Sequence, residues 1–185
     1  MIRLIAAALL LALASCAGDA PLPLAQNVAL DRYAGRWFVI ANIPYFAERG
    51  GVGSRFDISF PEGRVLDIYT AQSHDFTAPP SSFTMTGYIV PGTNNAQWRE
   101  TPLWPLYLSY LILHVEPDDQ TASAYQIALV GYPGRGYGWV LSRSPDMDDA
   151  TYRAQLKRFA DAGYDPAQFR RVPQHPGQIG QPDFQ

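Results

Sequence analysis

The chain has 185 residues, of which 17 % are charged and 47 % hydrophobic, and 14 basic residues against 17 acidic ones give a formal net charge of −3. This length suits one domain with a substantial core, and the lack of a basic stripe argues against nucleic acid as a partner. The single cysteine rules out an internal disulfide, so packing and hydrogen bonds must hold the fold.

The N-terminus predicts a lipoprotein signal peptide over residues 1–15. Arg3 precedes an apolar run over residues 4–13 that is too short to span a bilayer as a mature helix. The run ends in Leu-Ala-Ser-Cys, which resembles the bacterial lipobox and implies that Cys16 is acylated. The alternative is an ordinary cleaved signal with an incidental cysteine. Ala17 stands where an aspartate would resemble an inner-membrane sorting signal, so we expect a lipid anchor in the bacterial outer membrane, on its periplasmic face.

After a lipidated tether over residues 16–28, most of the chain has the pattern of strands. Runs with alternating or β-rich composition are separated by Gly, Pro, Asn and Asp. We predict eight strands, over residues 37–43, 56–60, 65–72, 82–90, 97–102, 107–115, 124–132 and 136–142. Eight sequential antiparallel strands that close into a barrel remove the sheet edges and leave room for one small ligand.

The sequence predicts one helix after the last of these strands. It begins among acidic residues near Pro145, which suit the positive end of a helix dipole, and Gly163 suits its C-terminal cap. Its apolar face is expected to pack on the barrel wall and consists of Tyr152, Leu156, Phe159 and Ala160. A short strand near residues 169–172 is expected beside the first strand. The Pro-, Gly- and Gln-rich residues 173–185 are predicted to be a disordered tail.

Two separated motifs carry a family resemblance. Tyr-Ala-Gly-x-Trp at residues 33–37 opens the first strand, and Ser-Arg at residues 142–143 closes the last one. Together with the stretch from Pro44 to Gly50, which includes Glu-Arg-Gly, they make residues 29–172 similar to the lipocalin family, closest to the bacterial outer-membrane lipoprotein lipocalins. A Thr-Asp-Tyr-like corner of that family is only weakly present around residues 123–125, which leaves the strand register between Trp98 and Tyr125 open.

The resemblance implies an all-β fold: an eight-stranded antiparallel up-and-down barrel with one C-terminal α-helix packed on its wall. It also implies that Trp37 plugs the closed end and that Arg143 stacks across it, with Gly35 as the third signature residue. Such a cation–π contact contributes about 0.5–2 kcal/mol. We therefore expect these three residues to be structural, the alternative being direct contact with a ligand.

The same resemblance and the alternation of barrel strands give the candidate ligand-binding residues. Residues at even spacing before Arg143 point inward by analogy with the family, and alternation groups the inward positions of the other strands. The candidates are Phe56, Ile58, Phe83, Met85, Ala128, Tyr137 and Trp139. The alternative for each is that it merely fills the core.

Two features between residues 98 and 113 stay open. Glu100 has the same parity as Trp98, so it points into an apolar cavity, at a cost of several kcal/mol if unpaired, unless the strand bends at Pro102 and lets it reach solvent. Residues 106–113 are apolar on both faces of the predicted strand. The outer face needs cover from the helix, from the membrane surface or from the partner in a homodimer.

The sequence offers little for catalysis or metal binding. His74, His114 and His175 lie on unrelated segments without a metal-ligand spacing, and there is no Gly-x-Ser-x-Gly motif. We therefore expect no metal, no cofactor and no enzymatic activity.

The resemblance implies a membrane-anchored protein that binds and stores or carries a fatty acid, a lysophospholipid or a similar hydrophobic ligand in the bacterial envelope. One alternative is a lipocalin-fold enzyme that uses Glu100 with Tyr107 or Tyr137 on an apolar substrate. The other is a structural envelope lipoprotein whose barrel is filled by its own side chains.

Overall fold

The computed structural model describes residues 20–119 and 121–185. The predicted signal peptide and Cys16 lie outside the described residues. Within the described ranges, no helix is long and apolar enough to cross a membrane.

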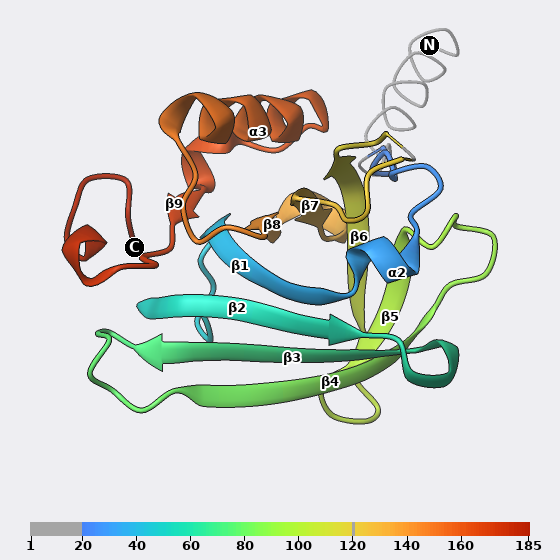
Figure 1. The fold of residues 1–185 in the computed structure, drawn as a ribbon, viewed down its shortest axis with the longest axis horizontal. Helices are drawn as coiled ribbons and strands as arrows, with labels where there is room; N and C mark the ends of the chain where they lie inside the picture. The colour runs from blue at the N-terminus through green and yellow to red at the C-terminus, as the bar shows by residue number, and fades with distance from the viewer. Residues whose placement is uncertain (1–19, 120) are drawn as a thin grey trace, which may run out of the picture.

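The described residues form a closed antiparallel barrel of eight strands, β1 to β8, and one further short strand, β9 (Figure 1). Each barrel strand pairs with the next one along the chain, and β1 also pairs with β8, which closes the barrel. The bounds are β1 (Gly35–Asn42), β2 (Gly51–Ser59), β3 (Arg64–Ser73), β4 (Ser81–Ile89), β5 (Gln97–Thr101), β6 (Leu108–Glu116), β7 (Ile127–Gly131), β8 (Gly138–Ser142) and β9 (Arg170–Arg171). The predicted fold class is confirmed.

Strand boundaries differ most from the prediction in β2 and β7. β2 begins at Gly51, because a register shift between Val52 and Arg55 lets the strand continue through Gly53, whose φ is +60°. β7 begins at Ile127 rather than at residue 124. Its predicted first residues are held elsewhere, since the Tyr125 N–H donates to the carbonyl of Arg32 at 3.3 Å.

Within residues 20–119 and 121–185, two α-helices flank the barrel. The short α2 (Leu30–Tyr33) precedes β1 at one end, and α3 (Asp149–Asp161) packs on the wall. Asp148 caps α3, accepting a hydrogen bond from the Thr151 N–H at 2.9 Å. The prediction that Ala160 belongs to the packed face is wrong. It is exposed, and Gln155 is buried in its place because that position completes the face with Tyr152 and Phe159.

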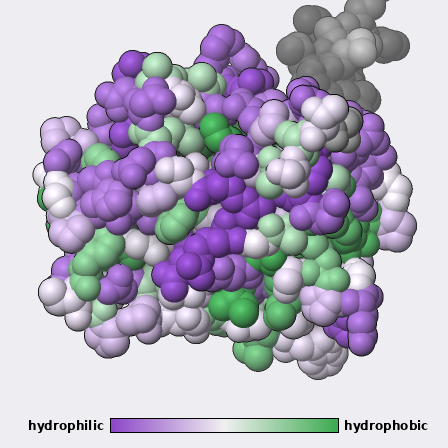
Figure 2. All heavy atoms as spheres, viewed as in Figure 1, coloured by the Kyte–Doolittle hydropathy of each residue, from purple (hydrophilic) through white to green (hydrophobic). Residues whose placement is uncertain are grey.

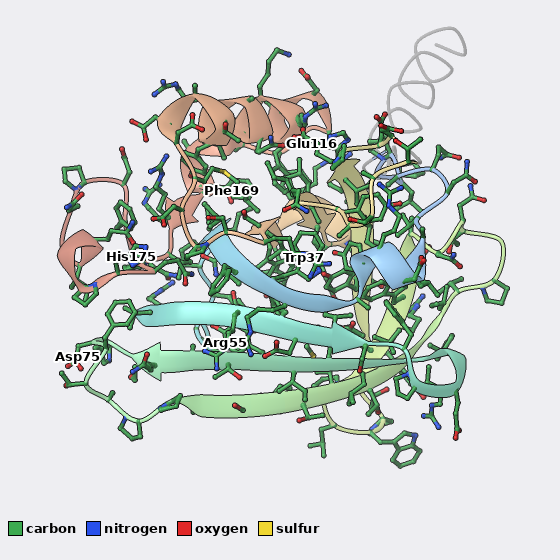
Figure 3. The ribbon with its side chains drawn as sticks, viewed as in Figure 1. Trp37, Arg55, Asp75, Glu116, Phe169 and His175 are labelled. Atoms are coloured by element: carbon green, nitrogen blue, oxygen red, sulfur yellow. The ribbon has the colours of Figure 1, made fainter. Side chains whose placement is uncertain are left out.

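Apolar side chains gather in an inner cluster and an outer cluster. The inner cluster fills part of the barrel and includes Trp37, Phe56, Ile58, Trp98, Tyr110 and Ala128. The outer cluster lies between the wall and α3 and includes Ile40, Leu129, Val140, Tyr152, Phe159 and Phe169. Figure 3 shows Phe169 between α3 and the barrel and Trp37 among the strands. Successive β-strand residues therefore alternate between the two clusters, as Ala128 and Leu129 do.

The outer face of β6 is covered in part by the chain itself. Residues 20–28 run beside this strand, where the Ala25 N–H donates to the Ile112 carbonyl at 2.9 Å. Leu113 packs in the outer cluster with α3 and Leu22. The loop before β6 has no such cover, since Leu103, Trp104, Leu106 and Tyr107 are exposed. The homodimer stays a prediction.

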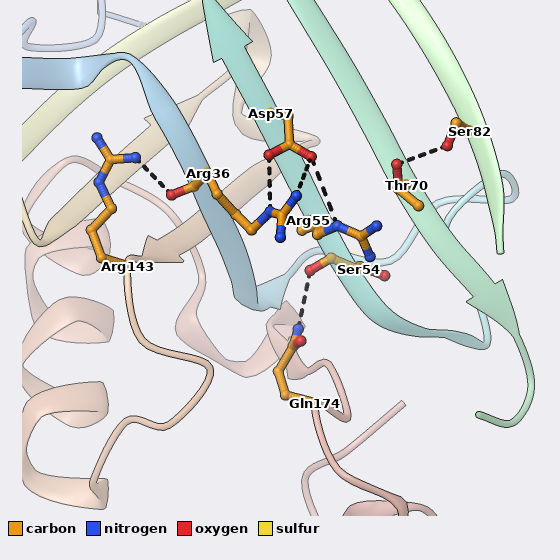
Figure 4. Close-up of polar contacts among 8 residues, drawn as sticks. All are labelled: Arg36, Ser54, Arg55, Asp57, Thr70, Ser82, Arg143 and Gln174. Carbon is orange, nitrogen blue, oxygen red and sulfur yellow. Dashed lines mark hydrogen bonds and ion pairs between the residues drawn. The ribbon is translucent and has the colours of Figure 1, made fainter. Parts of the chain in front are cut away.

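The C-terminal residues differ from the predicted disorder. The Gln174 amide is buried and donates to the Val39 carbonyl at 2.8 Å. It also donates to the Ser54 carbonyl at 3.1 Å (Figure 4). The Gln185 N–H donates to the Arg171 carbonyl at 3.0 Å. The amino-acid composition of residues 173–185 predicted disorder, because composition carries no information about a single buried amide. The Gln174 amide joins β1 and β2 of the barrel.

The outer face of β2 to β4 carries many polar side chains. Figure 2 shows that hydrophilic residues prevail on this side, with hydrophobic ones in small groups. Asp57 accepts from Arg36 at 2.9 Å and lies 3.8 Å from the Arg55 guanidinium (Figure 4). On the opposite phase of β2 and β4, Phe56, Ile58 and Met85 face the interior, where a ligand would lie.

Candidate ligand-binding site inside the barrel

The closed end is built on the contact between Arg143 and Trp37. The guanidinium carbon lies 3.7 Å from the centroid of the indole ring, within cation–π range. Gly35 has a φ of +106°, and a Cβ there would lie 3.2 Å from Arg143 Nη1. Glycine is therefore required at this position both for the backbone conformation and for the space that the guanidinium occupies.

The Arg143 guanidinium also gathers the chain around it. It donates at 2.6–3.1 Å to the backbone carbonyls of Arg32, Tyr33, Ala34, Arg36 and Tyr125. These carbonyls belong to α2, to the start of β1 and to the segment before β7. A single side chain thus holds together the segments that close this end, and its N–H groups are hydrogen-bonded to backbone carbonyls.

A group of aromatic rings forms the inner floor above this contact. The hydroxyls of Tyr33 and Tyr110 are hydrogen-bonded at 2.8 Å. The Tyr110 ring stacks on Trp98 with centroids 4.5 Å apart, and Tyr33 lies 5.1 Å from the Trp37 ring. These rings occupy the closed end, so any ligand enters from the opposite end.

The residues proposed from alternation fall into two groups. Phe56, Ile58 and Ala128 are buried in the inner cluster, and Met85 and Trp139 pack against it. Phe83 and Tyr137 are 49 % and 38 % exposed. Both lie toward the open end, where the loops β1–β2, β3–β4, β5–β6 and β7–β8 meet. The structure thus brings five of these residues together and leaves Phe83 and Tyr137 at the rim; ligand contact by all seven stays a proposal.

Glu48 closes part of the open end and was not among the predicted site residues. It is buried, accepts a hydrogen bond from the Trp139 indole N–H at 2.9 Å, and also accepts one from the Asn42 amide. Burial raises the pKa of the Glu48 carboxyl to about 7, although these hydrogen bonds oppose the rise. The Glu-Arg-Gly motif pointed to this residue, but the sequence did not reveal that its side chain turns inward.

Asp67 on β3 and Glu100 on β5 are buried at the floor of the barrel. Their exposed fractions are 0 % and 2 %. Asp67 shares the inward phase of Val65 and Tyr69, and Glu100 shares that of Trp98. This decides the alternative left open for Glu100, which faces the interior and does not reach solvent. Asp67 was missed, although an acid at an inward position of an apolar strand was a usable signal.

Neither floor carboxyl is satisfied by the protein. Within the described residues, both oxygens of Asp67 and Oε1 of Glu100 have no hydrogen-bond partner. Burial raises the pKa of the Asp67 carboxyl well above its ordinary value, and the nearby Glu100 charge raises it further. Burial likewise raises the pKa of Glu100. Buried carboxyl groups without hydrogen-bond partners lower the stability of the fold, so their presence in a core suggests a role in binding.

The tyrosines proposed as catalytic partners of Glu100 lie elsewhere. Tyr107 is 47 % exposed in the β5–β6 loop, and Tyr137 contacts Tyr45 and Tyr132 at the rim. Tyr33 and Tyr110 lie within electrostatic range of Glu100 instead. The predicted arrangement of Glu100 with Tyr107 or Tyr137 is therefore not present.

Surface features outside the barrel fit an apolar ligand less well. On the described part of the chain, a cleft of about 440 Å³ lies between β6, β7 and α3, and its lining includes His114, Glu116, Asp118, Gln126 and Arg158. A neighbouring cleft of about 220 Å³ lies along α3. No group of three metal-ligating side chains occurs among the described residues.

Comparison with known proteins decides the family. The model of the Lipocalin-like domain matches residues 28–174, most of the chain. The chain belongs to the lipocalin-like family. Temperature-induced lipocalin-1 of Arabidopsis thaliana is 28 % identical over 80 % of this lipocalin and 81 % of its own length. Outer membrane lipoprotein Blc of Escherichia coli K12 is 25 % identical, over 82 % of each chain.

Solved structures agree on the fold. Insecticyanin from the tobacco hornworm Manduca sexta superposes with a TM-score of 0.62 at 17 % identity, covering 88 % of this lipocalin and 89 % of its own chain. Relation to the Blc lipoproteins and the lipocalin barrel together support the binding of a hydrophobic ligand.

Proposed function

We propose that this lipocalin binds and carries a fatty acid, a lysophospholipid or a similar amphiphile inside its barrel. The observation that carries the proposal is the inner wall, where Phe56, Ile58, Met85, Ala128 and Trp139 come from four different strands into or against one cluster. An acyl chain gains about 0.8 kcal/mol for each buried CH₂ group. No covalent chemistry is needed for this role.

The expected site of action is the outer membrane of a bacterial envelope, at its periplasmic face. Relatives of this chain are named outer membrane lipoproteins, and the Leu-Ala-Ser-Cys motif ending at Cys16 supports the same placement. One acyl chain holds a protein to a membrane only reversibly, so stable retention requires two or three chains on the cysteine.

Chain length tests the proposed cavity. Acyl ligands of about 14–18 carbons should bind more tightly than one of 8, because each additional buried CH₂ contributes until the barrel is full. Binding should alter tryptophan fluorescence, and Trp139→Phe should remove most of the signal. An affinity that does not depend on chain length would mean that the tail stays outside the barrel.

Substitution of the cysteine tests the anchor. Cys16→Ala should move the protein from the membrane fraction to the soluble one, or leave its precursor unprocessed, and should abolish labelling with radioactive palmitate. If the variant still partitions with membranes in a detergent-dependent way, the anchor is not on Cys16.

An enzyme is the second candidate, favoured by the pair of buried acids at the floor. A carboxylic acid with a raised pKa is suited to general acid catalysis if a substrate's reacting atom comes within reach. Incubation with an amphiphilic ligand, followed by mass spectrometry, should show no new product. A product that disappears in Glu100→Gln would establish the enzyme in place of the carrier.

A further inference from the structure

We propose that the floor of the barrel binds a protonated amino group at the inner end of an apolar ligand, with Asp67 and Glu100 as its acceptors. The inference rests on the proposed binding of amphiphiles and narrows their chemical class. It begins from the two carboxyls that lack partners within the described residues.

Strand register places the two acids on opposite sides of β4, beside positions that are two residues apart along it. Asp67 is paired with Met85 on β4, whereas Gly87, two residues along, is paired with Val65 on one side and Glu100 on the other. Neighbouring strands are about 4.8 Å apart, so β3 and β5 are about 10 Å apart across β4. Both acids point inward from the strands on either side of β4, and a group between their carboxyls can contact both.

The surroundings of this position favour a cation over an anion. Asp57 and Glu48 are the other acids whose charges raise the pKa of Asp67. The hydroxyls of Tyr33 and Tyr110 complete the floor. The charges of Asp67 and Glu100 contribute to raising the pKa of both hydroxyls. The guanidinium of Arg143 is already used by the carbonyls of the closed end. A carboxylate head group would therefore be repelled at the floor.

A plain alkyl chain leaves this floor unsatisfied. Its terminal methyl group would displace water from the carboxyls without replacing the hydrogen bonds, and unpaired buried polar groups are costly. An ammonium group supplies three donors and a compensating charge. Its hydrogen bonds to carboxylates are charge-assisted and short, so one group can satisfy Asp67 and Glu100 together.

Three probes that differ at one end of the chain test the proposal. They are dodecanoic acid, 12-hydroxydodecanoic acid and 12-aminododecanoic acid, which share the carboxylate head expected at the mouth. Affinities are measured by tryptophan fluorescence and calorimetry on the wild-type protein and on Asp67→Asn/Glu100→Gln. Glu62→Gln, in the exposed turn between β2 and β3, removes the same kind of charge outside the barrel as a control.

The amino probe should bind the wild-type protein at least as tightly as dodecanoic acid does. The double variant should lower its affinity more than tenfold and should leave dodecanoic acid unchanged or bound more tightly, with the hydroxyl probe between them. Calorimetry in buffers of different ionisation enthalpy should show proton release on binding of the amino probe alone. Glu62→Gln should behave as wild type.

Two outcomes are distinct. If dodecanoic acid binds the wild-type protein but the ratio of the amino to the methyl probe is the same in the double variant, the floor does not select amines and the inference is wrong. If none of the probes binds either protein and both proteins fold, the proposed carrier function itself fails.

Discussion

The closed end and the floor of the same barrel differ in whether their polar side chains find hydrogen-bond partners within the chain. At the closed end, Arg143 donates to carbonyls from three segments and lies over Trp37. One layer further in, Asp67 and Glu100 are more deeply buried than Arg143, and both oxygens of Asp67 and Oε1 of Glu100 lack partners among the described residues. Hydrogen bonds that are complete within the chain stabilise a fold, whereas incomplete ones indicate a place that a ligand completes.

Removal of Arg143 should have the largest effect on stability. Arg143→Ala leaves several carbonyls of the closed end without donors, and we expect the free energy of unfolding to fall by about 3 kcal/mol. Denaturant unfolding measures the change. Arg143→Lys is the control, because it keeps the charge but loses the planar guanidinium. A large loss of ligand affinity with an unchanged melting temperature would instead assign Arg143 to the binding site.

Glu100→Gln should act in the opposite direction and depend on pH. The pKa of Glu100 is raised in the folded protein, so the folded state holds a proton that the unfolded state releases above pH 4.5. The free energy of unfolding therefore falls as the pH rises from about 4.5 through the raised pKa. Glutamine removes this loss, so the variant should be more stable than wild type by about 2 kcal/mol at pH 9, with little difference at pH 4.

Thermal melts of wild type and Glu100→Gln between pH 4 and pH 9 check that prediction. Parallel curves for the two proteins would show that Glu100 is stably ionised in the fold, and the contrast between floor and closed end would then disappear.

Gln174 belongs with the satisfied groups, and its loss should have a smaller effect. Gln174→Ala leaves the carbonyls of Val39 and Ser54 without this donor, for an expected loss of about 1 kcal/mol. Gln181→Ala, at an exposed position, is the control. Equal stability of the two variants would mean that residues 173–185 do not hold to the barrel in solution.

Glu48 combines features of both regions: it is a buried acid like Asp67 and Glu100, but it has hydrogen-bond partners as Arg143 does. Its pKa of about 7 predicts that the fluorescence of Trp139, whose indole donates to it, changes with a midpoint near pH 7 as the carboxyl ionises. Glu48→Gln should abolish this transition and barely change the melting temperature at pH 6. A transition that persists in the variant must come from another group.

The sequence predicted the features that depend on one strand at a time. Alternation located Phe56, Ile58 and Ala128 in the inner cluster, and the motifs around Trp37 and Arg143 located the contact at the closed end. The strand register that brings Asp67 toward Glu100 depends on pairings across β4, which no local pattern encodes.

Long-range hydrogen bonds explain the remaining differences. Gln174 and Glu48 are polar residues in loop-like segments, which sequence patterns assign to the surface. Each becomes buried because a distant strand supplies its partner: the Val39 carbonyl for Gln174 and the Trp139 indole for Glu48.

Gly87 occupies a position of the barrel at which almost no other residue can be accommodated. A Cβ at Gly87 would lie 2.3 Å from the backbone oxygen of Arg99, a distance that can be relieved only by moving β5 away from β4. A library with every amino acid at this position should therefore return glycine alone after selection for folded protein. Adaptation to a new ligand must then come from the residues around this position, because the β5 backbone leaves no room for a side chain at Gly87.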